Sequence, residues 1–320
     1  MAARSLIAAS RHRPRVDVSQ RRVRTFSAAS SSADADGKTV GLSFCGGGFM
    51  GAYHVGVWTA LREHHGAWLA QAPVTGASVG SLVGAGIVSD VDPRALGPVF
   101  DKVATRVRSL PLGAMTPFLP ALVDFARVEL ENVLPADAHE RCSGRLFVAV
   151  TEVSPRPRVS LRSTFGSREE LLDTLIASSF VPGVTGSVAE IPSVNGATAI
   201  DGGLVRNWPR LPKTDFHTIH VSPFAGDFAI CPPKSLAYPT VPFMGAAVQR
   251  SPQNLTTAVH AIFPPAIEGL NEYSDAGYKD AVAFLEGHRD TIAGVQEDRA
   301  HFEREVRVLD GRGGTSAAAS

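Results

Sequence analysis

The sequence predicts an α/β fold with three layers, in which helices cover both faces of a mostly parallel central sheet. Short apolar segments that end in glycine alternate with segments of helical periodicity along much of the chain. Of the 320 residues, 44% are hydrophobic and 19% are charged, which is typical of a chain with a buried core. Several of the predicted strands end in small or polar residues, as expected where an open α/β sheet carries its site.

The first half of the chain supplies the clearest alternation. Strands are predicted at 38–44 and 73–76, and helices at 50–64, 81–88, 93–108 and 121–134. The polar run 62–66 is expected to end the first helix, and Asp92 followed by Pro93 is a good helix start. The uncharged apolar segment 109–123 fits either a buried loop or an exposed lid that contacts lipid.

The second half predicts further strands and fewer helices. Strands are expected at 146–153, 159–165, 197–200 and 218–222, and helices at 171–179 and 276–308. Ser167 and Glu170 form a capping box before the first of these helices. The proline-rich segment 233–265 gives no clear helix or strand pattern.

The amino terminus differs in composition from the rest of the chain. Residues 1–32 contain many arginines, serines and alanines and a single acid, Asp17. This composition fits a mitochondrial or plastid transit peptide, or a disordered basic tail. We therefore expect three parts: residues 1–37 as this basic segment, 38–290 as the catalytic domain, and 291–320 as a helix end with a disordered tail.

Charge and cysteine content exclude several classes of protein. The formal net charge is zero, which gives no electrostatic reason to expect a nucleic-acid partner. Cys45, Cys142 and Cys231 have no zinc or disulfide spacing, so we expect no zinc site and a reducing compartment. No apolar run reaches the length of a transmembrane helix, so we expect any contact with lipid to be peripheral.

A glycine cluster follows the first predicted strand. Gly46, Gly48 and Gly51 have the spacing of a dinucleotide-binding loop, but the second strand ends without the acidic residue that would bind a ribose. The alternative is an oxyanion hole, in which backbone N–H groups of Gly47, Gly48 and Phe49 stabilise the negative charge that develops during acyl transfer.

A second glycine pair surrounds Ser78. Gly76-x-Ser78-x-Gly80 lies between a predicted strand and a predicted helix, which is the context of a nucleophile elbow. Small residues are needed there because the elbow holds its serine in a strained backbone conformation. The pattern predicts that Ser78 is a catalytic nucleophile.

The base that would activate Ser78 has two kinds of candidate. Asp201 ends a predicted strand, and Gly202 and Gly203 follow it in a turn that could expose its carboxylate. His217, His220 and His260 come later in the chain, in the order expected for a histidine triad.

Together these motifs resemble the patatin-like phospholipase family, most closely the branch that contains adipose triglyceride lipase. The similarity includes the runs LSFCGGGFMGAYHVGV, ASSFVPG and DGGLVRNWP and covers most of residues 40–285. It implies a patatin-like three-layer fold and a metal-independent serine hydrolase of fatty-acyl glycerolipid esters. In it, Ser78 is the nucleophile, Asp201 is the base, and Gly46, Gly47, Gly48, Phe49 and Gly51 form the oxyanion loop.

The resemblance also sets expectations about substrate and location. Many family members have Arg or Lys where this chain has Met50, so we expect an apolar mouth and favour triacylglycerol. A phospholipase A, an acylglycerol transacylase and a weakly active lipid-binding regulator on the same fold are the alternatives. We expect an intracellular protein at a lipid droplet or membrane surface, with a protein co-activator as a further candidate partner and the transit peptide as the competing prediction.

Overall fold

The computed structural model describes residues 39–110, 120–212 and 216–288. Its main sheet has the order β5-β6-β3-β2-β1-β7, and β4 pairs with β3 on the edge opposite β2 and β6. β8 and β9 form a separate hairpin. The strands are β1 (Thr39–Phe44), β2 (Val74–Ala77), β3 (Leu146–Glu152), β4 (Arg158–Arg162), β5 (Ser193–Val194), β6 (Ala197–Asp201), β7 (Phe216–Val221), β8 (Thr240–Phe243) and β9 (Ala246–Gln249). β7, β1, β2 and β3 are parallel to one another, and β4, β5 and β6 pair in antiparallel fashion. The predicted α/β class with a largely parallel centre is confirmed.

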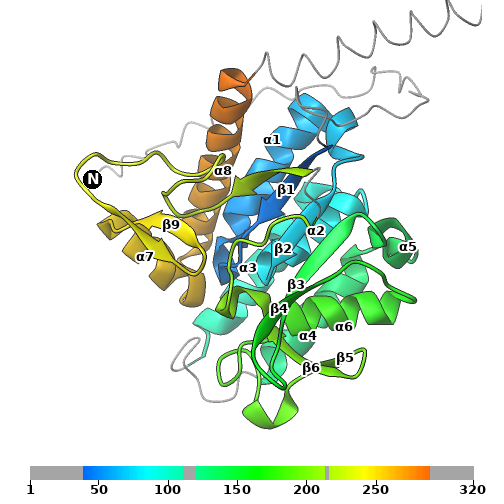
Figure 1. Cartoon of the computed structure of the whole chain (residues 1–320). Coiled ribbons are helices and arrows are strands. Elements are labelled where there is room, and N and C mark those ends of the chain that lie inside the picture. The colour runs from blue at the N-terminus through cyan, green and yellow to red at the C-terminus, as the bar shows by residue number, and fades with distance from the viewer. Residues whose placement is uncertain (1–38, 111–119, 213–215, 289–320) are drawn as a thin grey trace, which may run out of the picture.

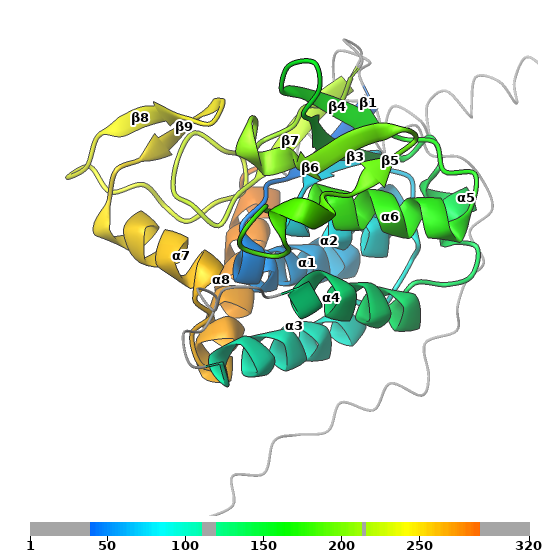
Figure 2. The same cartoon turned by 90° about the horizontal axis from the view of Figure 1, so that it is seen from below.

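Helices α1, α2 and α6 lie beneath the sheet in Figure 2, with α3 and α4 further from it. The helices are α1 (Gly51–Leu69), α2 (Val79–Val88), α3 (Pro93–Arg108), α4 (Pro120–Val133), α5 (Ala138–Cys142), α6 (Arg168–Ser178), α7 (Pro252–Ile262) and α8 (Ile267–Gly287). The largest apolar core includes buried side chains of the sheet and of α1, α2 and α6. α8 packs along α1, and Figure 1 shows the two helices side by side.

Several predicted elements have different bounds in the structure. α1 does not end at the polar run 62–66: His65 leaves helical geometry, with φ −138° and ψ 40°, and the helix then resumes as far as the buried Leu69. α8 begins at Ile267, well before the predicted start at 276, and ends at Gly287; the part of the predicted helix beyond 288 lies outside the described ranges. Burial of Leu270 explains the earlier start.

The proline-rich segment 233–265 contains the β8–β9 hairpin and helix α7, neither of which was predicted. Ser251 caps α7 by accepting a hydrogen bond from the Asn254 N–H at 3.2 Å, and Pro252 occupies its first turn. This is the same helix start that Asp92 and Pro93 give α3, so the signal was present in the sequence.

One edge of β3 is shared by two strands that run in opposite directions. β2 occupies this edge up to Ala77, which lies opposite Ala149. β6 takes over at the next residue, because Asp201 lies opposite Val150. Asp201 therefore reaches the end of β2 from β6, an antiparallel strand of which it is the last residue. The shared edge places Asp201 directly beside Ser78.

Other expectations fall on residues outside the described ranges. These are the basic segment 1–37, most of the apolar segment 109–123, and the tail 291–320. The three-part division of the chain therefore stays a prediction.

Candidate active site

Ser78 lies in the tight turn between β2 and α2. Its φ of 52° and ψ of −131° lie in a region that residues with a side chain rarely adopt. The flanking glycines make this turn sterically allowed. A Cβ on Gly76 would lie 2.4 Å from the Gly80 carbonyl oxygen, and a Cβ on Gly80 would lie 2.3 Å from the Phe44 carbonyl oxygen. The predicted elbow is thus present, with both glycines required by close backbone contacts.

The backbone of Ser78 is held by a second serine that sequence reasoning did not single out. The Ser78 N–H donates to the Ser178 Oγ at 3.0 Å, and the Ser178 hydroxyl donates to the Ala149 carbonyl oxygen at 2.7 Å. Ser178 is the last residue of α6 and is fully buried. It connects the strained turn to β3 through two hydrogen bonds.

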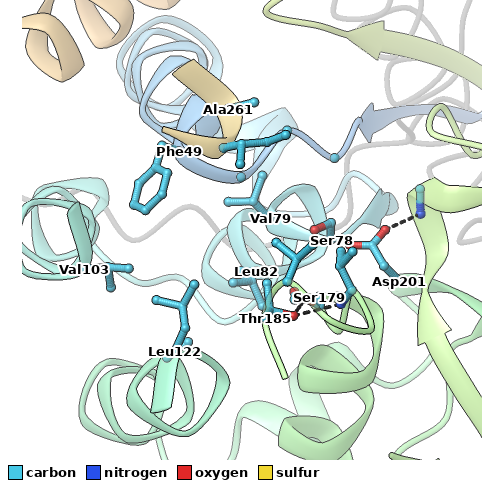
Figure 3. Close-up of a pocket in the computed structure, with 18 of the residues that line it drawn as sticks. Phe49, Ser78, Val79, Leu82, Val103, Leu122, Ser179, Thr185, Asp201 and Ala261 are labelled. Carbon is cyan, nitrogen blue, oxygen red and sulfur yellow. Dashed lines mark hydrogen bonds between the residues drawn. The ribbon is translucent and has the colours of Figure 1, made fainter. Parts of the chain in front are cut away.

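Asp201 is almost fully buried beside Ser78, and Figure 3 shows the two side chains together. Its Oδ1 accepts a hydrogen bond from the Gly203 N–H at 2.6 Å, and its backbone carbonyl accepts one from Thr151 at 2.9 Å. Burial raises the pKa of the Asp201 carboxyl to about 6, although hydrogen bonds from the Ser78 hydroxyl and from the backbone of Gly203 and Leu204 act in the opposite direction.

Gly202 and Gly203 form the turn after Asp201, as predicted. A Cβ on Gly202 would lie 2.1 Å from the Ala149 carbonyl oxygen, so only glycine fits. The turn is the short helix η4 (Gly202–Leu204), with Asp201 as its cap. The carboxylate is thereby fixed at a helix start, next to backbone N–H groups.

In the glycine loop, some backbone N–H groups donate hydrogen bonds to other described residues and some do not. The Gly46 N–H donates to the Asn207 Oδ1 at 2.9 Å, and the Gly51 N–H donates to carbonyl oxygens within the loop. Within the described ranges, the N–H groups of Gly47 and Gly48 have no such partner. Of the predicted oxyanion donors, Gly47 and Gly48 therefore have N–H groups available to a ligand, and the oxyanion role of the loop stays a prediction. Gly46 and Gly51 contribute to the shape of the loop.

Steric contacts explain two of these glycines. Gly48 has a φ of 51°, and a Cβ on it would lie 2.1 Å from the Ala261 carbonyl oxygen of α7. A Cβ on Gly51 would lie 2.3 Å from the Phe100 ring. The loop is therefore packed directly against α7 and α3.

A deep apolar pocket of about 450 Å³ opens beside Ser78 and Asp201. In Figure 3, Val103 of α3 and Leu122 of α4 project into it opposite Ser78. Among the described residues that line the pocket, only Asp201 has an ionisable side chain. The rest of the lining is apolar or uncharged, and its apolar members include Leu82, Val83, Leu96, Val99, Phe100, Val123, Ala126, Leu130 and Ile176. Such a pocket fits an extended hydrocarbon chain.

None of the three candidate histidines lines this pocket. His220 lies on β7, where it pairs with Ser43, and burial together with the charge of Arg210 lowers its pKa to about 4. His260 contacts the Tyr273 hydroxyl at 3.0 Å, and His217 lies earlier on β7. The geometry therefore favours Asp201 over a histidine as the partner of Ser78.

Met50 does not shape the mouth of the pocket. Its side chain is fully buried in a small apolar cluster that includes Phe49 and Leu270, and it is absent from the pocket lining. The expectation that Met50 leaves the mouth more apolar was therefore wrong. The apolar character comes from α2, α3 and α4 instead.

The described ranges contain neither a metal-binding cluster nor a membrane-spanning helix. We find no group of three or more His, Cys, Asp or Glu side chains there that could hold a metal ion. Within the same ranges, no helix combines the length and apolar character needed to cross a bilayer.

Comparison with known proteins identifies clear relatives. A family model described as patatin-like phospholipase matches residues 42–212. Human patatin-like phospholipase domain-containing protein 2 is 37% identical over 78% of this chain and 49% of its own length. Human 1-acylglycerol-3-phosphate O-acyltransferase PNPLA3 is 36% identical over 77% of this chain and 50% of its own length. Human patatin-like phospholipase domain-containing protein 4 is 34% identical over 78% of this chain and 97% of its own length.

The chain thus spans about half the length of the first two relatives and nearly all of the third. Among solved structures, VipD from Legionella pneumophila matches with a TM-score of 0.38 and 13% identity, over 83% of this chain and 72% of that chain.

Proposed function

The chain belongs to the patatin-like phospholipase family of lipid acyl hydrolases and transacylases, and from this premise we propose that it hydrolyses fatty-acyl esters of glycerolipids, with triacylglycerol as the favoured substrate. Residues 38–290 are the catalytic domain in this proposal, and the protein acts peripherally at a lipid surface. One observation carries the function: Ser78, in a strained backbone turn, lies beside the buried Asp201 carboxyl at an apolar pocket that both residues line.

The reaction uses Ser78 and Asp201 as a dyad. Asp201 accepts the hydroxyl proton while the Ser78 Oγ attacks the ester carbonyl carbon. The N–H groups of Gly47 and Gly48 stabilise the resulting oxyanion, and the start of α2 adds the positive end of a helix dipole. The tetrahedral intermediate collapses, Asp201 returns the proton to the leaving alcohol, and an acyl-serine remains. Water, deprotonated by Asp201, then releases the fatty acid and restores Ser78.

The pKa of Asp201 suits this role. An ordinary aspartate is a weak base for a serine hydroxyl, because its pKa is about 4. Burial raises the pKa of the Asp201 carboxyl to about 6, which brings it closer to neutral pH while leaving most of it ionised there. No metal or other cofactor is part of the proposed reaction.

The preference for a neutral lipid rests on the pocket lining. A phosphodiester headgroup would bring a negative charge close to Asp201, and the described lining offers no Lys or Arg to compensate for it. A triacylglycerol brings only uncharged ester groups. Electrostatics therefore favour the neutral substrate.

A transacylase is the second candidate. One relative carries the name 1-acylglycerol-3-phosphate O-acyltransferase, and an acyl-serine can be consumed by an acceptor alcohol in place of water. The same dyad serves both outcomes, because Asp201 deprotonates either nucleophile.

The test uses purified full-length protein and its Ser78→Ala variant. Each is incubated with triolein emulsion and with phosphatidylcholine vesicles, with and without a monoacylglycerol acceptor, and with a fluorophosphonate probe. We expect fatty acid release from triolein to exceed release from phosphatidylcholine, and probe labelling to disappear in the variant. Faster release from phosphatidylcholine would favour a phospholipase, transfer to the acceptor a transacylase, and the absence of both activities a lipid-binding regulator.

A further inference from the structure

Helix α7 has its polar and apolar faces exchanged relative to an ordinary surface helix. Surface helices of globular proteins normally bury an apolar stripe and expose a polar one. In α7 the buried residues are Asn254 and Thr257, while Leu255, Val259 and Ile262 are 68%, 48% and 48% exposed. These three apolar residues are spaced i, i+4 and i+7, so they form one continuous stripe.

Hydrogen bonds fix this orientation. The Asn254 side chain accepts from the Ala225 N–H at 2.8 Å, and it donates to the Ala225 and Gln249 carbonyl oxygens at 2.8 and 2.7 Å. Further along the same inward side, His260 contacts the Tyr273 hydroxyl at 3.0 Å. Turning the apolar stripe inward would break these bonds and leave buried polar groups unpaired, so the outward stripe is a stable feature.

The stripe leads to the pocket that contains Ser78. Ile262 is a member of the stripe and also lines the pocket, as does the neighbouring Ala261. Figure 3 shows Ala261 at the pocket, across from Leu122. The exposed Phe263 and Ile267 extend the apolar surface beyond the helix. Figures 1 and 2 both place α7 at the margin of the fold, next to the β8–β9 hairpin, whose Val241 and Phe243 are also exposed.

We propose that the outward face of α7, formed by Leu255, Val259 and Ile262, docks on a lipid surface and holds the mouth of the pocket against it. This inference rests on the proposed function, since it takes the substrate to be a water-insoluble ester. Two features favour lipid over a protein partner. The stripe is continuous with the substrate pocket, and α7 contains no Asp, Glu, Lys or Arg that would have to lose its hydration on contact with acyl chains.

The docking explains how substrate reaches Ser78. A triacylglycerol molecule cannot diffuse through water to a pocket, so the mouth must lie at the lipid surface for an acyl chain to enter. With α7 lying in the interface, the path from lipid to the pocket passes along Ile262 and remains apolar throughout. The oxyanion loop lies directly behind α7, because Gly48 packs on Ala261.

The test compares the full-length chain with a Leu255→Ser, Val259→Ser double variant, both in the Ser78→Ala background so that lipid is not consumed. Flotation with triolein emulsions coated with phosphatidylcholine measures binding. We expect the double variant to bind at least about tenfold more weakly, because two partly inserted apolar side chains are lost. Val128→Ser is the matched control: Val128 is 52% exposed on α4, outside the pocket lining, and its replacement should not change binding.

A second measurement does not depend on loss of binding. With Val259→Trp, tryptophan emission should shift to shorter wavelength when emulsion is added, relative to the parent protein. The double variant with Ser78 intact should retain hydrolysis of a soluble short-chain ester, which shows that its site is folded. Unchanged flotation of the double variant, an equal loss in Val128→Ser, or no spectral shift would overturn the docking surface. Failure of the parent protein to bind emulsion would also overturn it.

The two proposals fail in distinguishable ways. Binding through α7 without any ester hydrolysis by the wild-type chain would support the docking surface and contradict the proposed function. Hydrolysis of soluble esters with flotation unaffected by the α7 changes would support the function and overturn the docking surface.

Discussion

Both polar ends of the Asn207 side chain hydrogen-bond to the backbone of Gly46. Oδ1 accepts from the Gly46 N–H at 2.9 Å, and Nδ2 donates to the Gly46 carbonyl oxygen at 3.2 Å. Asn207 follows the Asp201 turn by a few residues, and its Oδ1 also lies close to Gly203, where an added Cβ would approach it to 2.6 Å. One side chain therefore sets the distance between the glycine loop and the turn that carries Asp201.

Replacing Asn207 with alanine should slow ester hydrolysis by roughly a hundredfold while leaving the fold intact, because a shift of about 1 Å in an oxyanion loop has an effect of this size. The loss should appear mainly in kcat, since Asn207 acts through the loop and not through ground-state binding of the acyl chain. Asn195→Ala, which removes an exposed asparagine bonded to Glu170, is the control. Equal kinetics for both variants would contradict a positioning role for Asn207.

The two hydrogen bonds of Ser178 lead to a second prediction. Ser178→Ala leaves the Ser78 N–H and the Ala149 carbonyl oxygen without this partner, which should cost about 1–3 kcal/mol of unfolding free energy. It should also lower kcat, because the strained turn loses its anchor. Denaturant unfolding and steady-state kinetics measure the two effects separately.

A matched control for Ser178 is Ser43 on strand β1. Ser43 is equally buried and donates to the Pro209 carbonyl oxygen at 2.6 Å, but it is not part of the pocket lining. We expect Ser43→Ala to lose comparable stability without the loss in kcat. If kcat fell equally in both variants, the effect of Ser178 would be a general one on the core.

Much of this site could be predicted from the sequence, for reasons that are local. The turn around Ser78 requires glycine two residues before and two residues after it, at Gly76 and Gly80. The turn after Asp201 requires Gly202, the next residue. Each pattern therefore lies within a few residues of the sequence. Asn207 and Ser178 escaped prediction because their partners, Gly46 and Ser78, lie far away in the sequence. Nothing in their neighbouring residues marks that role.

The elements of the fold were likewise predicted where their signals are local and missed where they depend on distant segments. β1, β2 and α3 were predicted with nearly correct bounds because their apolar spacing and caps are local. The direction of β6 was not, since an antiparallel strand on the β3 edge depends on pairing between distant segments. α7 is an exception: it was missed because the prolines around it suggested a loop, although its start at Ser251 and Pro252 and the helical spacing of its apolar residues are local signals.

The acidity of Asp201 gives a prediction about rate. Because burial raises its pKa to about 6, activity on a soluble ester should rise with pH through about 6, well above the range of an ordinary aspartate. A histidine base would give a similar limb, so variants must accompany the profile. His220→Gln and His260→Gln should keep the limb and most of the rate, whereas Asp201→Asn should abolish hydrolysis. An inactive histidine variant with an intact fold would contradict the dyad.

The same shift predicts how stability changes with pH. The unfolded carboxyl loses its proton near pH 4, whereas the folded one keeps it up to about pH 6. Between these values the unfolded state binds fewer protons, so this carboxyl makes the free energy of unfolding fall as pH rises, by about 3 kcal/mol in total. Asp201→Asn should lack this fall. Denaturant titrations at pH 4 and pH 7 compare the two proteins, and an identical pH dependence would mean that Asp201 has an ordinary pKa.

The apolar pocket predicts chain-length selectivity. Ala126 lines it from α4, so Ala126→Phe should fill part of the space that an acyl chain occupies. We expect hydrolysis of long-chain esters to fall by at least about tenfold, since lost apolar contact of one or two methylene groups has effects of this order. Hydrolysis of a short-chain ester should change little, because a short acyl group stays near Ser78. Val128→Phe, two residues along the same helix but outside the lining, should preserve the selectivity of the wild-type chain. A parallel loss on short and long esters in Ala126→Phe would mean that the acyl chain lies elsewhere.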